Sequence, residues 1–234
     1  MKFSSRIYNI LVFCLLINVP VLAQKFDSFV GIRFGAVLPM GEFASHEYGY
    51  GGYALLGKSF GGEAAWFITP KIGFGVDACM NTCEFASGYY AQDIYEANIQ
   101  DYNKVTYISG PYRIKTFMGG AYYKMAFSPK FHTSFKLMGG LYIARSPDQM
   151  YRIEAKFLNL NSYGWKYGAT DKNFSFLAGA SFEYKLYNEV SLLIQADFSY
   201  TRASFTFITS STTGYTDLLK MPIFRLQPGV NIHF

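Results

Sequence analysis

The sequence predicts an all-β protein, an eight-stranded antiparallel up-and-down transmembrane β-barrel, and three observations lead to this fold class. First, 19% of the 234 residues are Phe, Tyr or Trp, while only 16% are charged, a composition that favours strands over helical bundles. Second, apolar and polar residues alternate along eight separate segments. Third, short and long connections alternate between these segments, as they do in membrane barrels.

The first 23 residues have the pattern of a secretory signal peptide. Lys2 and Arg6 precede the apolar run 10–17, and 21–23 (Val-Leu-Ala) fits a cleavage site before Gln24. A membrane anchor is the weaker alternative, because a spanning helix needs about 20 apolar residues. We therefore expect a signal peptide at 1–23 and one barrel domain at 24–234.

Charge and cysteine content argue against several classes of function. Loss of Lys2 and Arg6 with the signal lowers the formal net charge from +5 to +3, too weak a bias to predict nucleic-acid binding. Cys79 and Cys83 would lie roughly 13 Å apart on a straight strand, beyond the ~7 Å limit for a disulfide. Two free thiols and a loop disulfide both remain open. The three histidines are scattered, so we expect no metal site and no cofactor.

Each predicted strand alternates with a period of two residues. In the first strand, Val30, Ile32 and Phe34 lie on one face and Gly31, Arg33 and Gly35 on the other. The clearest case is the seventh, where Val190, Leu192, Ile194, Ala196 and Phe198 oppose Ser191, Leu193, Gln195, Asp197 and Ser199. In chain order, the predicted strands are 26–38, 55–68, 71–80, 113–127, 131–144, 174–186, 190–200 and 222–234. Strands of about ten residues can cross a bilayer at a tilt near 45°.

The connections between these strands fall into two classes. Short turns lie at 69–70, 128–130 and 187–189, whereas the long polar or aromatic connections are 39–54, 84–112, 146–172 and 206–221. Outer-membrane barrels place short turns in the periplasm and long loops outside. The even strand count then puts both termini on the periplasmic side.

The direction of the alternation decides whether the barrel meets lipid or water, because a lipocalin-like soluble barrel buries its apolar face inside. The polar face carries only one or two charges per strand, fewer than a soluble surface normally holds. We therefore expect these charges to pair inside the lumen; the candidates are Arg33, Glu63, Asp77, Lys124, Lys136, Glu183, Lys185, Asp197 and Arg225.

Together, the signal segment, the eight amphipathic strands and the loop asymmetry resemble the small outer-membrane β-barrel family of OmpA/OmpX type. A C-terminal aromatic strand adds to the resemblance. It implies outer-membrane lipid as the surroundings and a C-terminal signal read by the barrel-assembly machinery, at Phe224, Leu226, Val230, Ile232 and Phe234. Pro222 and Pro228 lack ladder donors and predict a bulge or a strand end there.

We expect function to reside in the long loops, because eight strands leave a lumen that side chains fill and Tyr123, Tyr142 and Leu177 are bulky. Aromatic loops suit adhesion to, or recognition of, an extracellular or envelope protein. The candidates are Tyr89, Tyr90, Tyr95, Tyr102, Tyr107, Tyr151, Tyr163, Trp165 and Tyr167. The alternatives are an envelope transport or secretion component, a narrow porin, and a lipid-modifying enzyme using His46 between Ser45 and Glu47.

Overall fold

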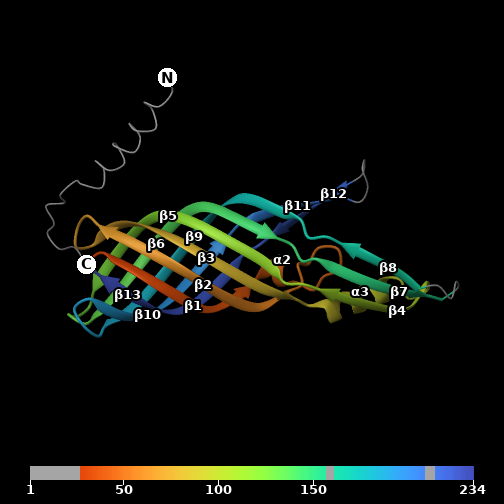
Figure 1. Cartoon of the computed structure of the whole chain (residues 1–234), viewed down its shortest axis with the longest axis horizontal. Helices are drawn as coiled ribbons and strands as arrows, with labels where there is room; N and C mark the ends of the chain where they lie inside the picture. The colour runs from red at the N-terminus through yellow and green to blue at the C-terminus, as the bar shows by residue number, and fades with distance from the viewer. Residues whose placement is uncertain (1–26, 157–160, 209–213) are drawn as a thin grey trace, which may run out of the picture.

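The computed structural model describes residues 27–156, 161–208 and 214–234, so the predicted signal peptide lies outside the described residues. Eight antiparallel strands close into a barrel in the order β1-β13-β10-β9-β6-β5-β3-β2 (Figure 1), which confirms the predicted fold class. The strands are β1 (Phe29–Pro39), β2 (Ala54–Phe67), β3 (Ile72–Phe85), β5 (Tyr112–Ala126), β6 (Phe131–Arg145), β9 (Thr170–Lys185), β10 (Val190–Tyr200) and β13 (Ile223–His233).

The barrel wall exposes its apolar residues and buries its polar ones. On β1, Ile32 and Phe34 are 61% and 62% exposed, whereas Arg33 between them is 2% exposed. A water-facing barrel would show the opposite arrangement, because apolar surface is buried away from water. The polar face therefore lines the lumen, and the apolar face forms an outer belt suited to lipid.

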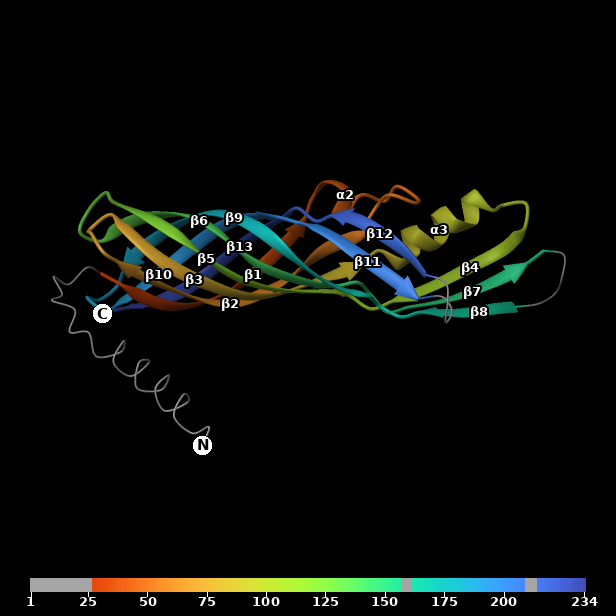
Figure 2. The ribbon, with the colours of Figure 1, turned by 90° about the horizontal axis from the view of Figure 1, so that it is seen from above.

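The barrel has two different ends. Turns at 68–71, 127–130 and 186–189 close what we call the turn end, where β1 begins and β13 finishes. The opposite, loop end carries an extension that the sequence analysis treated only as long connections (Figure 2). This loop extension consists of α2 (Gly41–Ala44), α3 (Ser87–Ala97), β4 (Tyr102–Ser109), β7 (Gln149–Ala155), β8 (Asn161–Lys166), β11 (Arg202–Ile208) and β12 (Gly214–Lys220). Among the described residues, no helix is long and apolar enough to cross a membrane.

The strands of the loop extension form two separate sheets, whereas the strands of the barrel form one closed sheet. Strands β7 and β8 follow β6 and precede β9, and β11 and β12 lie between β10 and β13 in the chain. In the barrel β9 pairs with β10, but within the described part of the extension β8 pairs only with β7 and β11 only with β12. Beyond the loop end of the β9–β10 pair, the wall thus divides into two sheets, β4-β7-β8 and β11-β12 (Figure 2). We call this division the fork.

Three details of the structure bear on the sequence-based expectations. Pro222 directly precedes β13, as a strand end requires, but Pro228 lies inside it without a register shift against β10 or β1. The segment 49–53, which belongs to the long connection 39–54, ends in the buried Tyr53. Cys79 and Cys83 are both free and buried on β3, which is the free-thiol alternative.

Candidate functional site

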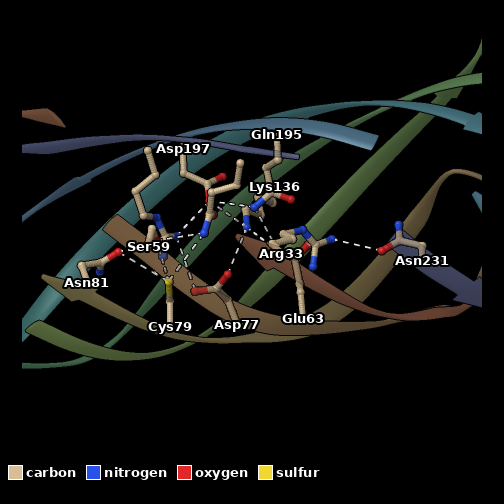
Figure 3. Close-up of polar contacts among 12 residues, drawn as sticks. Arg33, Ser59, Glu63, Asp77, Cys79, Asn81, Lys136, Gln195, Asp197 and Asn231 are labelled. Carbon is tan, nitrogen blue, oxygen red and sulfur yellow. Dashed lines mark hydrogen bonds and ion pairs between the residues drawn. The ribbon is translucent and has the colours of Figure 1, made fainter. Parts of the chain in front are cut away.

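The centre of the lumen holds a network of buried charges around Lys136 (Figure 3). Its Nζ lies 2.5 Å from Glu63 Oε2, 3.3 Å from Asp197 Oδ2 and 3.4 Å from Asp77 Oδ2. These four residues come from β6, β2, β10 and β3, so one lysine joins strands from opposite sides of the barrel. Three carboxylates could not share this space without a cation between them.

Two arginines complete the central network. Arg33 Nη2 lies 3.2 Å from Glu63 Oε1, and Arg225 Nη2 lies 2.8 Å from Asp197 Oδ2 and 3.5 Å from Asp77 Oδ1. The network therefore contains three cations and three anions. Their side chains are almost fully buried, and burial of ions is tolerated only when each is paired. The arrangement has the properties of a structural plug with no surplus of either sign.

A second cluster of charges lies at the turn end of the lumen. Asp27 receives hydrogen bonds from Lys124 at 2.5 Å and Lys185 at 2.7 Å, and His233 Nδ1 lies 3.0 Å from its Oδ1. Burial raises the pKa of Asp27, but hydrogen bonds from His233 and the two lysines outweigh burial and hold that pKa well below its usual range. His233 Nε2 also lies 2.5 Å from Glu183 Oε1.

All nine charged residues proposed from the sequence lie in these two clusters. Asn231 links the clusters, because it accepts a hydrogen bond from Arg33 and donates one to Glu183. The sequence analysis missed Asp27 and His233 as members of the second cluster. The alternation could have indicated both residues. Asp27 lies an even number of residues from Arg33, and His233 an even number from Arg225, so each shares the polar face of its strand.

Ser191, His233 and Asp27 resemble a catalytic triad in their contacts but not in their surroundings. Ser191 Oγ lies 2.7 Å from His233 Nε2, whose ring Nδ1 faces Asp27. However, Nε2 also faces Glu183, so carboxylates meet both ring nitrogens and both are placed to donate protons. A ring that donates from Nε2 cannot serve as the base for the serine. Ser191 is also fully buried, which leaves no room for a substrate.

Above the charges, the lumen becomes polar and then apolar toward the loop end. Gln227 donates to Ser59 Oγ at 2.9 Å, and Ser59 donates to Asn81 at 2.6 Å. Beyond this layer most inward side chains are apolar and almost fully buried, although Thr116 and Ser199 lie among them. The apolar side chains are Val37, Cys83, Ile114, Tyr142, Met221 and Ile223. Leu177 also points inward, but Tyr123, expected inside, is 43% exposed. Tyr123 follows the inward Tyr122 on β5, so parity places it outside.

We predict that the purified protein conducts no ions. Paired charges, a polar layer and an apolar layer fill successive levels of the lumen, and a selective pore would need an open path with one sign of charge. Planar-bilayer recording checks this expectation, with an open porin in the same bilayer as the positive control. Reproducible unitary steps from the wild-type protein would contradict it and favour a narrow porin.

An aromatic cluster joins the barrel to the loop extension. Tyr53, Phe85 and Tyr90 pack with ring centroids 4.8 to 5.8 Å apart. Tyr107 on β4 lies 4.7 Å from the Tyr90 ring. Tyr53 also donates a hydrogen bond of 2.5 Å to Asp93 on α3. Burial raises the pKa of Tyr90 to about 12, so its phenol is neutral near pH 7. These contacts hold the extension against the barrel as a folded unit.

A groove of about 860 Å³ lies at the fork. It is lined from α3, β4, β7 and β8 on one side and from β11 and β12 on the other. The principal side chains are Tyr90, Tyr107, Tyr151, Lys166, Phe207 and Tyr215. In the described part of the chain, Lys166 is the one charged residue of the lining. Its Nζ lies 3.8 Å from the Phe207 ring centroid and 5.3 Å from that of Tyr215, within the range of cation–π attraction.

The structure divides the nine aromatic loop residues into three groups. Tyr90, Tyr107 and Tyr151 meet at the groove, where the Tyr107 and Tyr151 rings stack at 6.3 Å. Tyr89, Tyr163, Trp165 and Tyr167 are 59% to 79% exposed, and of these Trp165 and Tyr167 also line the groove. Tyr95 and Tyr102 lie apart from the groove on α3 and β4. Sequence reasoning missed Lys166, Phe207 and Tyr215, because only the fork brings β8, β11 and β12 together.

His46 does not lie in a catalytic arrangement. Its ring stacks between Tyr53 and Tyr89, at centroid distances of 5.5 and 4.7 Å. Ser45 Oγ instead accepts a hydrogen bond from the backbone N–H of Glu47. Among the described residues, no group of three or more potential ligands forms a metal site.

The proposed assembly-signal residues follow the outward face of β13. Leu226, Ile232 and Phe234 are 48% to 59% exposed, and Phe224 and Val230 are half-buried. The Phe234 ring lies 5.9 Å from that of Trp66, at the turn end. Their role in assembly stays a prediction.

A closed barrel with an apolar wall and paired internal charges defines the class of transmembrane β-barrels. Neither a protein-family model nor a curated protein matches the sequence. Among solved structures, Neisserial surface protein A matches with a TM-score of 0.50 and 11% identity, over 88% of this chain and 97% of that chain. A major outer membrane protein from Thermus thermophilus matches with a TM-score of 0.49 and 12% identity, over 88% and 99%. The chain has the fold of the small eight-stranded outer-membrane barrels.

Proposed function

We propose that the protein is an integral outer-membrane barrel with a closed lumen that uses its loop extension to recognise an extracellular or envelope partner. The observation that carries the proposal is the groove at the fork. Aromatic side chains give large contact area with few torsions to fix. In addition, the facing edges of β8 and β11 have no strand partner among the described residues, and free edges can accept an extended peptide.

The membrane part of the proposal predicts that the protein fractionates with the outer membrane and migrates faster on electrophoresis without boiling than after boiling. The closed ladder of hydrogen bonds keeps such a barrel compact until heat opens it. A protein found in the periplasm without detergent, or one with no mobility shift, would contradict this prediction. The lipocalin-like alternative would then apply.

The recognition part predicts that groove variants lose binding while the barrel stays folded. Phe207→Ala and Tyr151→Ala remove aromatic surface from opposite sides of the groove, whereas Tyr187→Ala, 76% exposed at a turn of the other end, is the control. Labelled protein in detergent is tested on arrays of immobilised peptides and glycans. We expect a ligand that the control retains and the groove variants bind at least 10-fold more weakly, because buried aromatic anchors dominate interfaces. Equal binding by all variants, or no ligand, would contradict recognition through the groove.

A further inference from the structure

Four basic side chains gather on the outward wall of the barrel at its loop end. They are Arg113 and Lys115 on β5, Arg145 on β6 and Lys172 on β9, and all four are exposed. Strand register brings them together: Arg113 lies opposite Arg145, and Ile143 lies between Lys115 and Lys172. We call these four residues the basic wall patch.

The charges of the basic wall patch are mostly uncompensated. Arg145 Nη2 lies 3.1 Å from both carboxylate oxygens of Asp148, and these groups are 46% and 52% exposed. Within the described ranges, Arg113, Lys115 and Lys172 form no ion pair. Like charges directly opposite each other on neighbouring strands repel. Asp148 supplies an anion that interacts with both Arg145 and Arg113, so Lys115 and Lys172 are the members that lack an anion among the described residues.

The basic wall patch begins where the outer apolar belt finishes. One step toward the turn end, the outward residues on the same three strands are Phe117, Leu141 and Phe174, which are 53%, 43% and 60% exposed. The charges thus lie at the height where hydrocarbon would give way to lipid headgroups. On the neighbouring strands β10 and β13, the outward residues near the loop end include Phe198 and Phe224.

We propose that the basic wall patch binds the phosphate groups of anionic lipids in the membrane leaflet around the loop end. The inference rests on the proposed residence in the outer membrane and adds a specific lipid site to it. Two guanidinium groups and two ammonium groups match phosphate oxygens, to which arginine can donate two parallel hydrogen bonds. Basic residues beside an anionic lipid surface each add several-fold to its affinity.

The test compares two double variants in nonionic detergent micelles. Lys115→Gln with Lys172→Gln removes two charges from the basic wall patch. Lys71→Gln with Lys130→Gln removes two exposed charges from the turn end. The folded fraction is followed by unboiled electrophoresis during heating, with phosphatidylglycerol, lipid A, phosphatidylcholine or inorganic phosphate added.

We expect phosphatidylglycerol and lipid A to raise the unfolding temperature of the wild-type protein, and phosphatidylcholine and inorganic phosphate to leave it unchanged. The patch variant should bind the anionic lipids about 30-fold more weakly, and the turn-end variant should match the wild type. If inorganic phosphate stabilised the protein as much as the anionic lipids do, the proposal that the bound phosphate belongs to a lipid would be wrong. Equal weakening in both variants, or no effect of anionic lipid on a protein that is still heat-modifiable, would overturn the site and leave the barrel assignment standing.

Discussion

Lys136→Met is expected to destabilise the barrel by about 3 to 5 kcal/mol, because removing one partner of a buried ionic network leaves uncompensated charge. Without Lys136, the carboxylates of Glu63, Asp77 and Asp197 keep only two arginines. Methionine preserves most of the side-chain volume, so the decrease in stability is due mainly to the missing charge and less to altered packing. Urea titration in lipid vesicles, read from the folded band without boiling, measures the change.

Two further variants make this expectation specific. Lys130→Met changes the same residue type at an exposed turn and should alter stability by at most about 0.5 kcal/mol. Lys136→Met with Asp197→Asn leaves the pairs Arg33–Glu63 and Arg225–Asp77. Since that network is balanced again, the double variant should be more stable than Lys136→Met alone. A loss in Lys136→Met no larger than in Lys130→Met would contradict a stabilising role for the central network.

The strands of the barrel and their lumen-facing residues could be predicted from the sequence because they follow a local pattern, the period of two residues. Alternation at every second residue predicts the strands and separates their two faces, and the low number of charges indicates that the polar face points inward. Arg33, Lys136 and Arg225 were therefore placed in the lumen without any knowledge of their partners. Their actual contacts depend on strand register around a closed sheet. For example, Lys136 and Glu63 are 73 residues apart in the chain, and no local pattern reports such a distance.

The loop extension was harder to predict, since its strands are short and their pairing is not local. Paired residues of β4 and β7 lie 40 to 53 positions apart in the chain, whereas β5 and β6 pair across a short turn. The groove lies where β8 and β11, as far as the structure describes them, do not pair with each other. Tyrosine content indicated the importance of this region, but it could not show that Tyr90, Tyr107 and Tyr151 would meet while Tyr95 and Tyr102 lie elsewhere.

The outward face of β10 gives the sharpest test of what surrounds the barrel. Ile194 is 58% exposed and lies mid-strand between Phe182 and Pro228 on the neighbouring strands. Arginine at a lipid-facing midplane position of a barrel costs about 2 to 4 kcal/mol. We therefore expect Ile194→Arg to reduce the free energy of unfolding in vesicles by about this amount, as measured by urea titration.

The matched control for Ile194→Arg is Leu218→Arg. Leu218 is 75% exposed on β12 of the loop extension, beyond the barrel wall, so its replacement should change stability by at most about 0.5 kcal/mol. The adjacent Gln195 is 1% exposed and donates hydrogen bonds to Glu63 and Asp197. Arginine there would meet two carboxylates, so Gln195→Arg should cost less than Ile194→Arg despite about 1 to 3 kcal/mol of overpacking. If Ile194→Arg proves no more costly than Leu218→Arg, water and not hydrocarbon covers the outward face of β10.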